Sequence, residues 1–458
     1  METFSVISSV PNLRSLDSKK QEILMRKYQQ LLDSKCFIRL AALLCLLVPL
    51  TMTVVFAQGG TPPAVPVPSL TVNVGQTSPV VFTSVTFTTA GTLENIAVVT
   101  QGALNKDFNA APGGTCTPGQ IYAVGQSCIE YYTFSPLAAG ERMGAIVATD
   151  GSGNALGTRY LTGVGIGPMG LFTNAVPTTT IGGLNATRGM SMDGNGNIYW
   201  ANTNQSTGYL EELPHNSNTV VQLGGAINFS CGSHSAGATA VDGAGNIYLA
   251  AGCGAIYQYE NSSLVYVTAV PSLDDNLEVD GQGNLYTSGF SNGNVGAIYL
   301  VSVQTHNLVT LLAGNLGHRF VSMGIDANGD LFPVDYYTNT LFEIPAGQSA
   351  LQPLFSGNGL SNPDAVALDP AGNIYVCNLS GPDQVVRYAA GTWQATPLPA
   401  VGTVGIFLDN SGNLITLTSS NTLQVFIRTP PASVFPPPLM GPPLRLRWWN
   451  LKMTATRG

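Results

Sequence analysis

The sequence predicts an all-β protein, and three observations carry this prediction. Short apolar runs alternate with polar residues and are separated by turns rich in glycine, asparagine and proline. Glycine contributes 52 of the 458 residues, whereas charged residues make up only 10% of the chain. Average soluble domains contain about 25% charged residues and about 7% glycine, so helix-rich and coiled-coil folds are disfavoured. Finally, one short motif recurs six times between residues 190 and 415.

Residues 1–57 are predicted to form an N-terminal extension that ends in an export signal or a signal anchor. The segment from Leu40 to Ala57 contains no charged residue, follows several basic residues and ends in small side chains. This order is typical of a secretory signal. Cleavage is favoured over anchoring, since a spanning helix needs about 20 apolar residues. We therefore expect a secreted or cell-envelope protein that contacts the membrane only through this segment, if it is not cleaved.

The charge distribution excludes one class of partner. Residues 58–428 contain one lysine, six arginines and 22 acidic residues, a net charge of −15. Nucleic-acid binding depends on lysine and arginine side chains that neutralise phosphates. We therefore expect no DNA or RNA partner.

The first folded unit is predicted at residues 69–168, after a proline-rich linker at residues 58–68. Its short alternating strands and frequent turns, over about 100 residues, are typical of a β-sandwich. The segments Cys128–Pro136 and Leu161–Gly165 resemble immunoglobulin-like domains of the abnormal-spindle/hydin type. The resemblance implies a spacer or docking module without catalytic activity.

Two cysteine pairs are candidates for disulfides in an exported protein. Cys116 and Cys128 close a short loop in the predicted sandwich, and Cys231 and Cys253 flank one predicted hairpin.

The repeated motif predicts the second folded unit, at residues 170–428. Each copy reads apolar-x-apolar-Asp-x-x-Gly-Asn/Asp-Ile/Leu, so that a strand enters a turn and a second strand returns. A third strand follows each copy, and the spacing of about 43 residues fits one propeller blade. The sequence thus predicts a six-bladed β-propeller after an immunoglobulin-like β-sandwich, with Leu171–Ile181 pairing beside Leu423–Ile427 to close the ring. The predicted structural turns begin at Asp193, Asp242, Asp280, Asp326, Asp369 and Asp409.

The copies resemble NHL repeats, as in the segment Val366–Val376 (VALDPAGNIYV). The resemblance covers residues 170–428 and implies the same six-bladed fold, in a secreted bacterial type of protein. The remaining residues, 429–458, are rich in proline and then basic, and are predicted to be a disordered tail.

The ligand site is predicted on the propeller face opposite the aspartate turns. Polar and aromatic side chains from the loops on that face suit an extracellular protein, peptide or saccharide. We expect the protein to act as a monomer. The candidate ligand-binding residues are Asn202, Asp335, Tyr336, Tyr337, Asn378, Asp275, Arg319 and Asp364.

No catalytic residue, metal ligand or cofactor site is predicted. The sequence lacks a nucleophile elbow and a phosphate-binding loop, and its four histidines lie in different repeats. The favoured function is therefore an exported, non-catalytic recognition or scaffold protein. The alternative is a propeller hydrolase or lyase, similar to lactonases that hold a divalent metal in the central channel. The sequence leaves enzymatic activity open and favours a protein that is not an enzyme.

Overall fold

The fold is known from a computed structural model. The residues that it describes all belong to one compact unit, and they include no α-helix and no helix able to cross a membrane. The predicted export segment, linker and tail lie outside them. The described residues are 70–167, 177, 179–182, 184, 189–203, 207–228, 237–251, 254–271, 276–291, 295–302, 309–381, 385–398 and 403–427.

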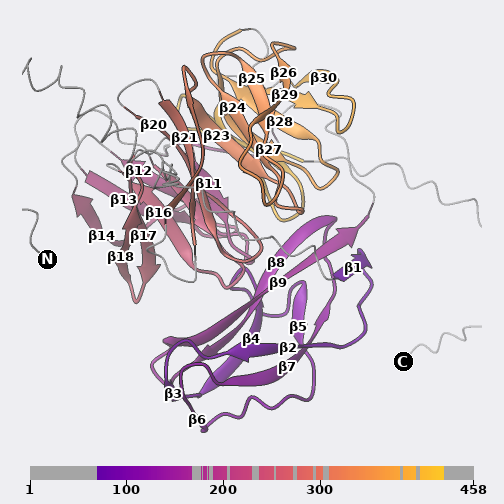
Figure 1. The fold of residues 1–458 in the computed structure, drawn as a ribbon, viewed down its shortest axis with the longest axis vertical. Helices are drawn as coiled ribbons and strands as arrows, with labels where there is room; N and C mark the ends of the chain where they lie inside the picture. The colour runs from indigo at the N-terminus through magenta and orange to yellow at the C-terminus, as the bar shows by residue number, and fades with distance from the viewer. Residues whose placement is uncertain are drawn as a thin grey trace, which may run out of the picture. The chain divides into compact units, whose positions relative to one another are not determined.

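Residues 70–166 form a β-sandwich of two main sheets with one short two-stranded ribbon (Figure 1). One sheet has the order β1-β9-β8-β4, the other the order β2-β7-β5, and the ribbon pairs β3 with β6. The strands are β1 (Leu70–Asn73), β2 (Val81–Thr86), β3 (Gly91–Thr92), β4 (Asn95–Thr100), β5 (Phe108–Ala110), β6 (Ile121–Tyr122), β7 (Ser127–Phe134), β8 (Gly140–Thr149) and β9 (Ala155–Ile166).

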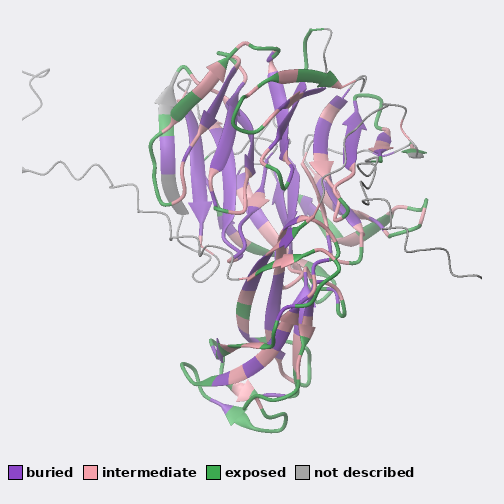
Figure 2. Ribbon diagram, turned by 90° about the vertical axis from the view of Figure 1, so that its right-hand side faces the viewer, coloured by how far each residue is buried: buried purple, intermediate pink, exposed green. Residues whose placement is uncertain are grey.

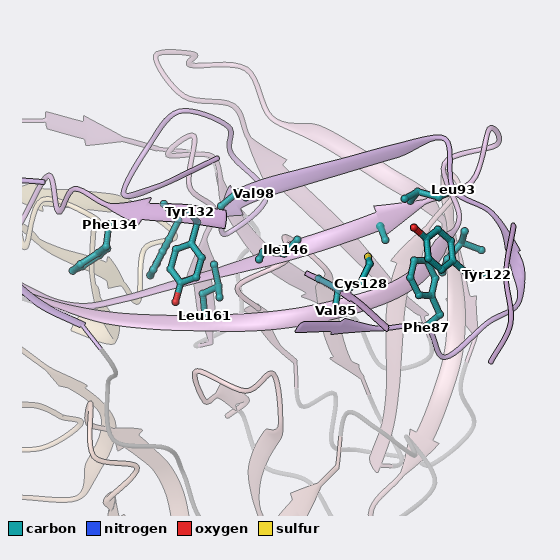
Figure 3. Packing of buried hydrophobic residues seen from close by; sticks show 13 residues of the cluster. Val85, Phe87, Leu93, Val98, Tyr122, Cys128, Tyr132, Phe134, Ile146 and Leu161 are labelled. Atoms are coloured by element: carbon teal, nitrogen blue, oxygen red, sulfur yellow. The ribbon is translucent and has the colours of Figure 1, made fainter. Parts of the chain in front are cut away.

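The core of the sandwich lies between its two sheets (Figure 3). In β7 every second side chain is buried, which is the period of a strand with one face against a core. Val85 of β2 and Phe134 of β7 meet Ile146 of β8 and Leu161 of β9 in this cluster. Burying side chains of this size stabilises a fold by roughly 1.5–3 kcal/mol each.

The predicted disulfide between Cys116 and Cys128 is confirmed. Their sulfur atoms are bonded, and the Cα atoms lie 4.9 Å apart. Cys128 lies in β7 and belongs to the core, so the bridge fixes the preceding loop to the sandwich. The other candidate pair, Cys231 and Cys253, lies outside the described residues.

The predicted all-β propeller is confirmed by six four-stranded antiparallel sheets, here called blades 1–6 (Figure 1). Blade 1 has β11 (Met190–Met192), β12 (Ile198–Thr203), β13 (Thr207–Leu213) and β14 (Val221–Asn228). Blade 2 has β15 (Ala238–Val241), β16 (Ile247–Ala251), β17 (Ala255–Glu260) and β18 (Ser263–Ala269). Blade 3 has β19 (Glu278–Val279), β20 (Leu285–Ser291), β21 (Val295–Val301) and β22 (Val309–Leu316). Blade 4 has β23 (Phe320–Ile325), β24 (Leu331–Asp335), β25 (Thr340–Glu343) and β26 (Gln352–Ser356). Blade 5 has β27 (Pro363–Leu368), β28 (Ile374–Asn378), β29 (Val385–Tyr388) and β30 (Ala395–Leu398). Blade 6 has β31 (Thr403–Leu408), β32 (Leu414–Thr418), β33 (Leu423–Phe426) and β10 (Thr179–Ile181).

Blade 6 closes the ring as predicted. Its outer strand β10 comes from the segment that precedes the first blade, and Thr180 pairs with Gln424 of β33 in an antiparallel register. The inner strand of each blade contacts the inner strand of the next, and β31 of blade 6 contacts β11 of blade 1. Closure protects sheet edges that an open array would expose.

The outermost strands of the blades are less buried than the second strands (Figure 2). In blade 5, all residues of the second strand β28 are buried, whereas the outer strand β30 has none that is fully buried. The second strands of blades 2 and 5, β16 and β28, are buried along their whole length, because they lie between neighbouring blades.

Candidate functional site

The six aspartate turns share one hydrogen-bond pattern. In blade 1, Oδ1 of Asp193 accepts bonds of 2.9 Å from the backbone amides of Asn195 and Asn197. Its Oδ2 accepts from Asn197 Nδ2 at 2.9 Å and from the Tyr199 hydroxyl at 3.1 Å. Both carboxylate oxygens of Asp193 therefore accept hydrogen bonds from groups in or next to the turn. The aspartates of the other five turns also accept both backbone bonds, and these are Asp242, Asp280, Asp326, Asp369 and Asp409.

The sandwich contacts the propeller through this turn face. The Tyr160 hydroxyl of β9 donates to Asp242 Oδ2 at 2.7 Å. Arg142 Nη1 of β8 donates to the backbone oxygen of Asn410 at 3.0 Å, while its Nη2 pairs with Asp107 at 2.9 Å. The predicted ligand face, on the opposite side of the ring, is not involved in these contacts.

Close backbone approach explains glycine at the second position of the first three turns. A Cβ atom on Gly243 would collide with the backbone of Gly144, and one on Gly281 would collide with the Thr162 side chain. Neither glycine has a positive φ, so the requirement comes from the sandwich and not from the turn conformation. Blades 4, 5 and 6 carry Ala327, Pro370 and Asn410 at this position.

On the opposite face, four of the predicted ligand residues lie together around the carboxylate of Asp335. This side chain is fully buried and accepts hydrogen bonds from His318 Nδ1 at 2.7 Å and from the backbone amide of Arg319 at 2.8 Å. It also accepts from the amide of Tyr337 at 3.1 Å and from the Thr338 hydroxyl. Asp335 therefore holds the loop before β23 and the loop after β24 in place. Because Asp335 itself is buried, a ligand could contact only its neighbours.

Those neighbours form the Arg319 cluster, which we define as Phe290, Arg319, Tyr336 and Tyr337. The guanidinium carbon of Arg319 lies 5.4 Å from the ring centroid of Tyr336 and 5.9 Å from that of Phe290. The ring centroid of Tyr337 lies 5.7 Å from that of Phe290 and 5.8 Å from that of Tyr336. Tyr337 itself is 50% exposed. Sequence reasoning missed Phe290, because it lies near the end of a strand in blade 3 while the other members belong to blade 4.

The remaining predicted ligand residues are placed differently. Asn202 Nδ2 donates to Glu211 Oε1 within blade 1 at 2.8 Å. The Asn378 amide bonds the backbone of Gly359 and of Ser361, and Asp364 is buried in β27. Asp275 lies outside the described residues.

An axial cavity of about 560 Å³ lies at the centre of the ring. It is lined by the inner strands of all six blades and, at the turn face, by residues 139–143 of the sandwich. Besides the turn aspartates Asp326, Asp369 and Asp409, two glutamates line it, Glu278 from β19 and Glu141 from β8. Burial raises the pKa of each to about 8, and for Glu141 the nearby Asp326 and Asp280 add to this rise.

The donor set does not fit the divalent metal of the alternative function. Within the described ranges, no group of three or more histidine, cysteine, aspartate or glutamate side chains could hold a metal ion. Of the two described histidines, His318 bonds Asp335, and the backbone amide of His215 donates to Asn197. We therefore derive no chemical step from a metal.

Comparisons with known proteins report similarity only to solved structures. No model of a protein family matches the chain, and no curated protein does. A gluconolactonase from Xanthomonas campestris is 12% identical with a TM-score of 0.43, covering 56% of this chain and 93% of that one. Regucalcin, a calcium-binding protein from Agrobacterium tumefaciens, is 17% identical with a TM-score of 0.42, covering 58% and 97%. Virginiamycin B lyase from Staphylococcus aureus is 10% identical with a TM-score of 0.41, covering 72% and 99%. Since these scores are below 0.5, the fold assignment depends on the six sheets themselves.

Proposed function

We propose that this chain is an exported, non-catalytic recognition or scaffold protein whose propeller binds an extracellular protein, peptide or saccharide at the Arg319 cluster. In this proposal the propeller is of the NHL type, and the sandwich is an immunoglobulin-like docking module. The protein acts as a monomer and needs no cofactor.

The observation that carries the proposal is the half-exposed Tyr337 beside an arginine that lies against two aromatic rings. Tyrosine and arginine are enriched among the residues that dominate binding energy at interfaces. An aromatic ring also offers a large contact area at a low entropic cost, because few side-chain torsions must be fixed.

The hydrogen bonds of Asp335 support a preorganised site. They hold the backbone of Arg319 and of Tyr337 in the free protein. Preorganisation lowers the entropic cost of binding, since the loops need not be ordered by the ligand.

The charge and the disulfide support the location. A net charge of −15 over residues 58–428 disfavours phosphate-rich partners. The bridge between Cys116 and Cys128 fits an oxidising compartment, as does the predicted export signal.

The test is a selection of ligands on the purified full chain, with a displayed random-peptide library and a glycan array as probes. We expect binders whose affinity falls at least tenfold in Tyr337→Ala and in Arg319→Ala. The matched control is Tyr266→Ala, which removes a tyrosine that is 57% exposed on β18. Binders that respond equally to Tyr266→Ala and to Tyr337→Ala would contradict the assignment, as would binders that respond to neither.

A further inference from the structure

The axial cavity has both apolar and acidic side chains in its lining. Its lining includes apolar side chains such as Met190, Met192 and Ile406, the turn aspartates Asp326, Asp369 and Asp409, and two glutamic acids, Glu278 and Glu141. The two acids come from different parts of the fold, since Glu278 lies in blade 3 and Glu141 in the sandwich. The cavity is therefore complete only when sandwich and propeller are joined.

Among the described residues, the cavity lining holds one arginine, Arg142, whose two Nη atoms are engaged while its buried Nε has no hydrogen-bond partner. The Nη2 atom of Arg142 pairs with Asp107, and Nη1 donates to the backbone of Asn410. The charged groups that act on Glu141 are Asp326 and Asp280, which are acidic as well. With a pKa of about 8, both carboxyl groups are mostly protonated at neutral pH, although a side-chain hydrogen bond with Asn276 opposes the rise for Glu278.

Asn276, whose side chain also bonds Glu278, provides a second sign of a ligand. Its side chain lines the same cavity, and the residue is only 4% exposed. Its Nδ2 donates to the backbone oxygen of Met323 at 3.2 Å, but its Oδ1 is buried and accepts no hydrogen bond. Leaving a buried acceptor without a partner is costly, so such an atom calls for an explanation. A donor that arrives with a ligand would supply the missing bond.

We propose that the axial cavity binds a small organic cation, a primary alkylamine or diamine, whose ammonium group donates to the Glu278 carboxylate and to Asn276 Oδ1. Glu141 closes the sandwich end of the site and offers a second carboxylate to a diamine. The apolar side chains contact the alkyl chain. Binding the ammonium form ionises a carboxylic acid, and the released proton passes to solvent while no other bond is broken.

Proton release gives the proposal a direct test. The full chain is titrated with 1,5-diaminopentane in a calorimeter at pH 7, in two buffers that differ in ionisation enthalpy. We expect binding with about one proton released for each carboxyl group that becomes ionised, because a nearby cation lowers a carboxyl pKa. We also expect 1,5-pentanediol, a neutral molecule of similar size, to show no binding.

Two variants locate the site. Glu278→Gln removes the ionisable group but resembles the protonated acid, so the fold should be retained at neutral pH, as its melting temperature would show. We expect diamine binding to weaken at least tenfold in Glu278→Gln and proton release to fall in Glu141→Gln. The matched control is Glu260→Gln at the exposed end of β17, which should bind as the unmodified chain does.

Several results would overturn the proposal. These are the absence of diamine binding at millimolar concentration, equal binding of the diol, and unchanged binding in folded Glu278→Gln. Stoichiometric uptake of Ca²⁺ or Zn²⁺ that excludes the diamine would also overturn it, because the cavity would then be a metal site.

Discussion

The Tyr160 hydroxyl of the sandwich donates a 2.7 Å hydrogen bond to the same Asp242 oxygen that accepts from Asn246 Nδ2 in the turn of blade 2. Burial raises the pKa of Asp242, and the bonds from Asn246 and Tyr160 oppose this rise. The carboxylate therefore stabilises both its own turn and the contact between the two folded units.

Replacing Tyr160 with phenylalanine should weaken this contact. The change removes a hydrogen bond to a buried carboxylate and leaves the ring in place, so we expect a loss of about 1.5–3 kcal/mol in the free energy of unfolding. Urea denaturation measures it. Tyr266→Phe, at an exposed ring, is the control and should be neutral. Equal stability of the two variants would show that the Tyr160 bond contributes nothing.

A methyl group at Gly243 should disturb the same interface. Gly243→Ala places a Cβ against the backbone of Gly144, which cannot move as a flexible side chain could. Overpacking of this kind costs roughly 1–3 kcal/mol. Gly225→Ala is the matched control, because no atom lies within 4 Å of its Cβ position. Thermal unfolding compares the two, and a Gly225→Ala variant that is the less stable of the pair would contradict the prediction.

The turn aspartates of the propeller should matter more than an exposed copy of the same turn. Asp369→Ala removes the acceptor for the backbone amides of Ala371 and Asn373 and for the Tyr375 hydroxyl, and the bonds from Asn373 and Tyr375 are buried. We expect a loss of about 2–4 kcal/mol, since buried donors lose their partner. Chemical denaturation at pH 7 gives the value.

Asp150 supplies the matched control for that experiment. Its Oδ1 accepts from the amides of Ser152 and Asn154 at 2.9 Å in the exposed turn between β8 and β9. Water can replace these bonds, so Asp150→Ala should cost clearly less than Asp369→Ala. A larger loss of unfolding free energy in Asp150→Ala than in Asp369→Ala would show that burial does not determine how much these hydrogen bonds contribute.

Stability should fall as the pH rises from about 4.5 to about 8. Between these values Glu141 and Glu278 are ionised in the unfolded chain and protonated in the folded one, so the unfolded state binds fewer protons and is favoured by increasing pH. Each pKa unit corresponds to about 1.4 kcal/mol per group, which sets the upper limit of the effect. Denaturation midpoints at pH 5 and pH 8 measure it. Glu278→Gln should reduce the dependence and Glu260→Gln should not, and a midpoint that rises with pH in the unmodified chain would contradict the assignment.

Much of the fold could be predicted because the repeat encodes local structure. Six turns at blade spacing, each followed by a third strand, predicted six blades and the closing pair of β10 and β33. The turn alone would have been ambiguous. Residues 150–154 (DGSGN) form the same turn in the sandwich with the same hydrogen bonds, but Thr149 and Ala155 stand where the repeat has an apolar residue and Ile or Leu.

Less of the site could be predicted, because it depends on contacts between distant segments. The positions of loops before and after repeat strands predicted Arg319, Asp335, Tyr336 and Tyr337. That Asp335 is a buried hydrogen-bond acceptor depends on packing, which the sequence does not show. The entry of Glu141 into the cavity depends on how the sandwich contacts the ring. One sequence signal could have revealed that contact, namely glycine at the second turn position in blades 1–3 and other residues in blades 4–6.

The pairing of β10 with β33 has a consequence for the order of assembly. During synthesis from the N-terminus, the sandwich and the first five blades could fold before residues 423–426 are made. Until then, residues 179–181 have no partner strand. The last blade, and with it the enclosed axis, can form only at the end of synthesis. A protein shortened before residue 423 would therefore keep most of its sheets, but its ring would stay open. The unpaired strand edges could then pair with other chains.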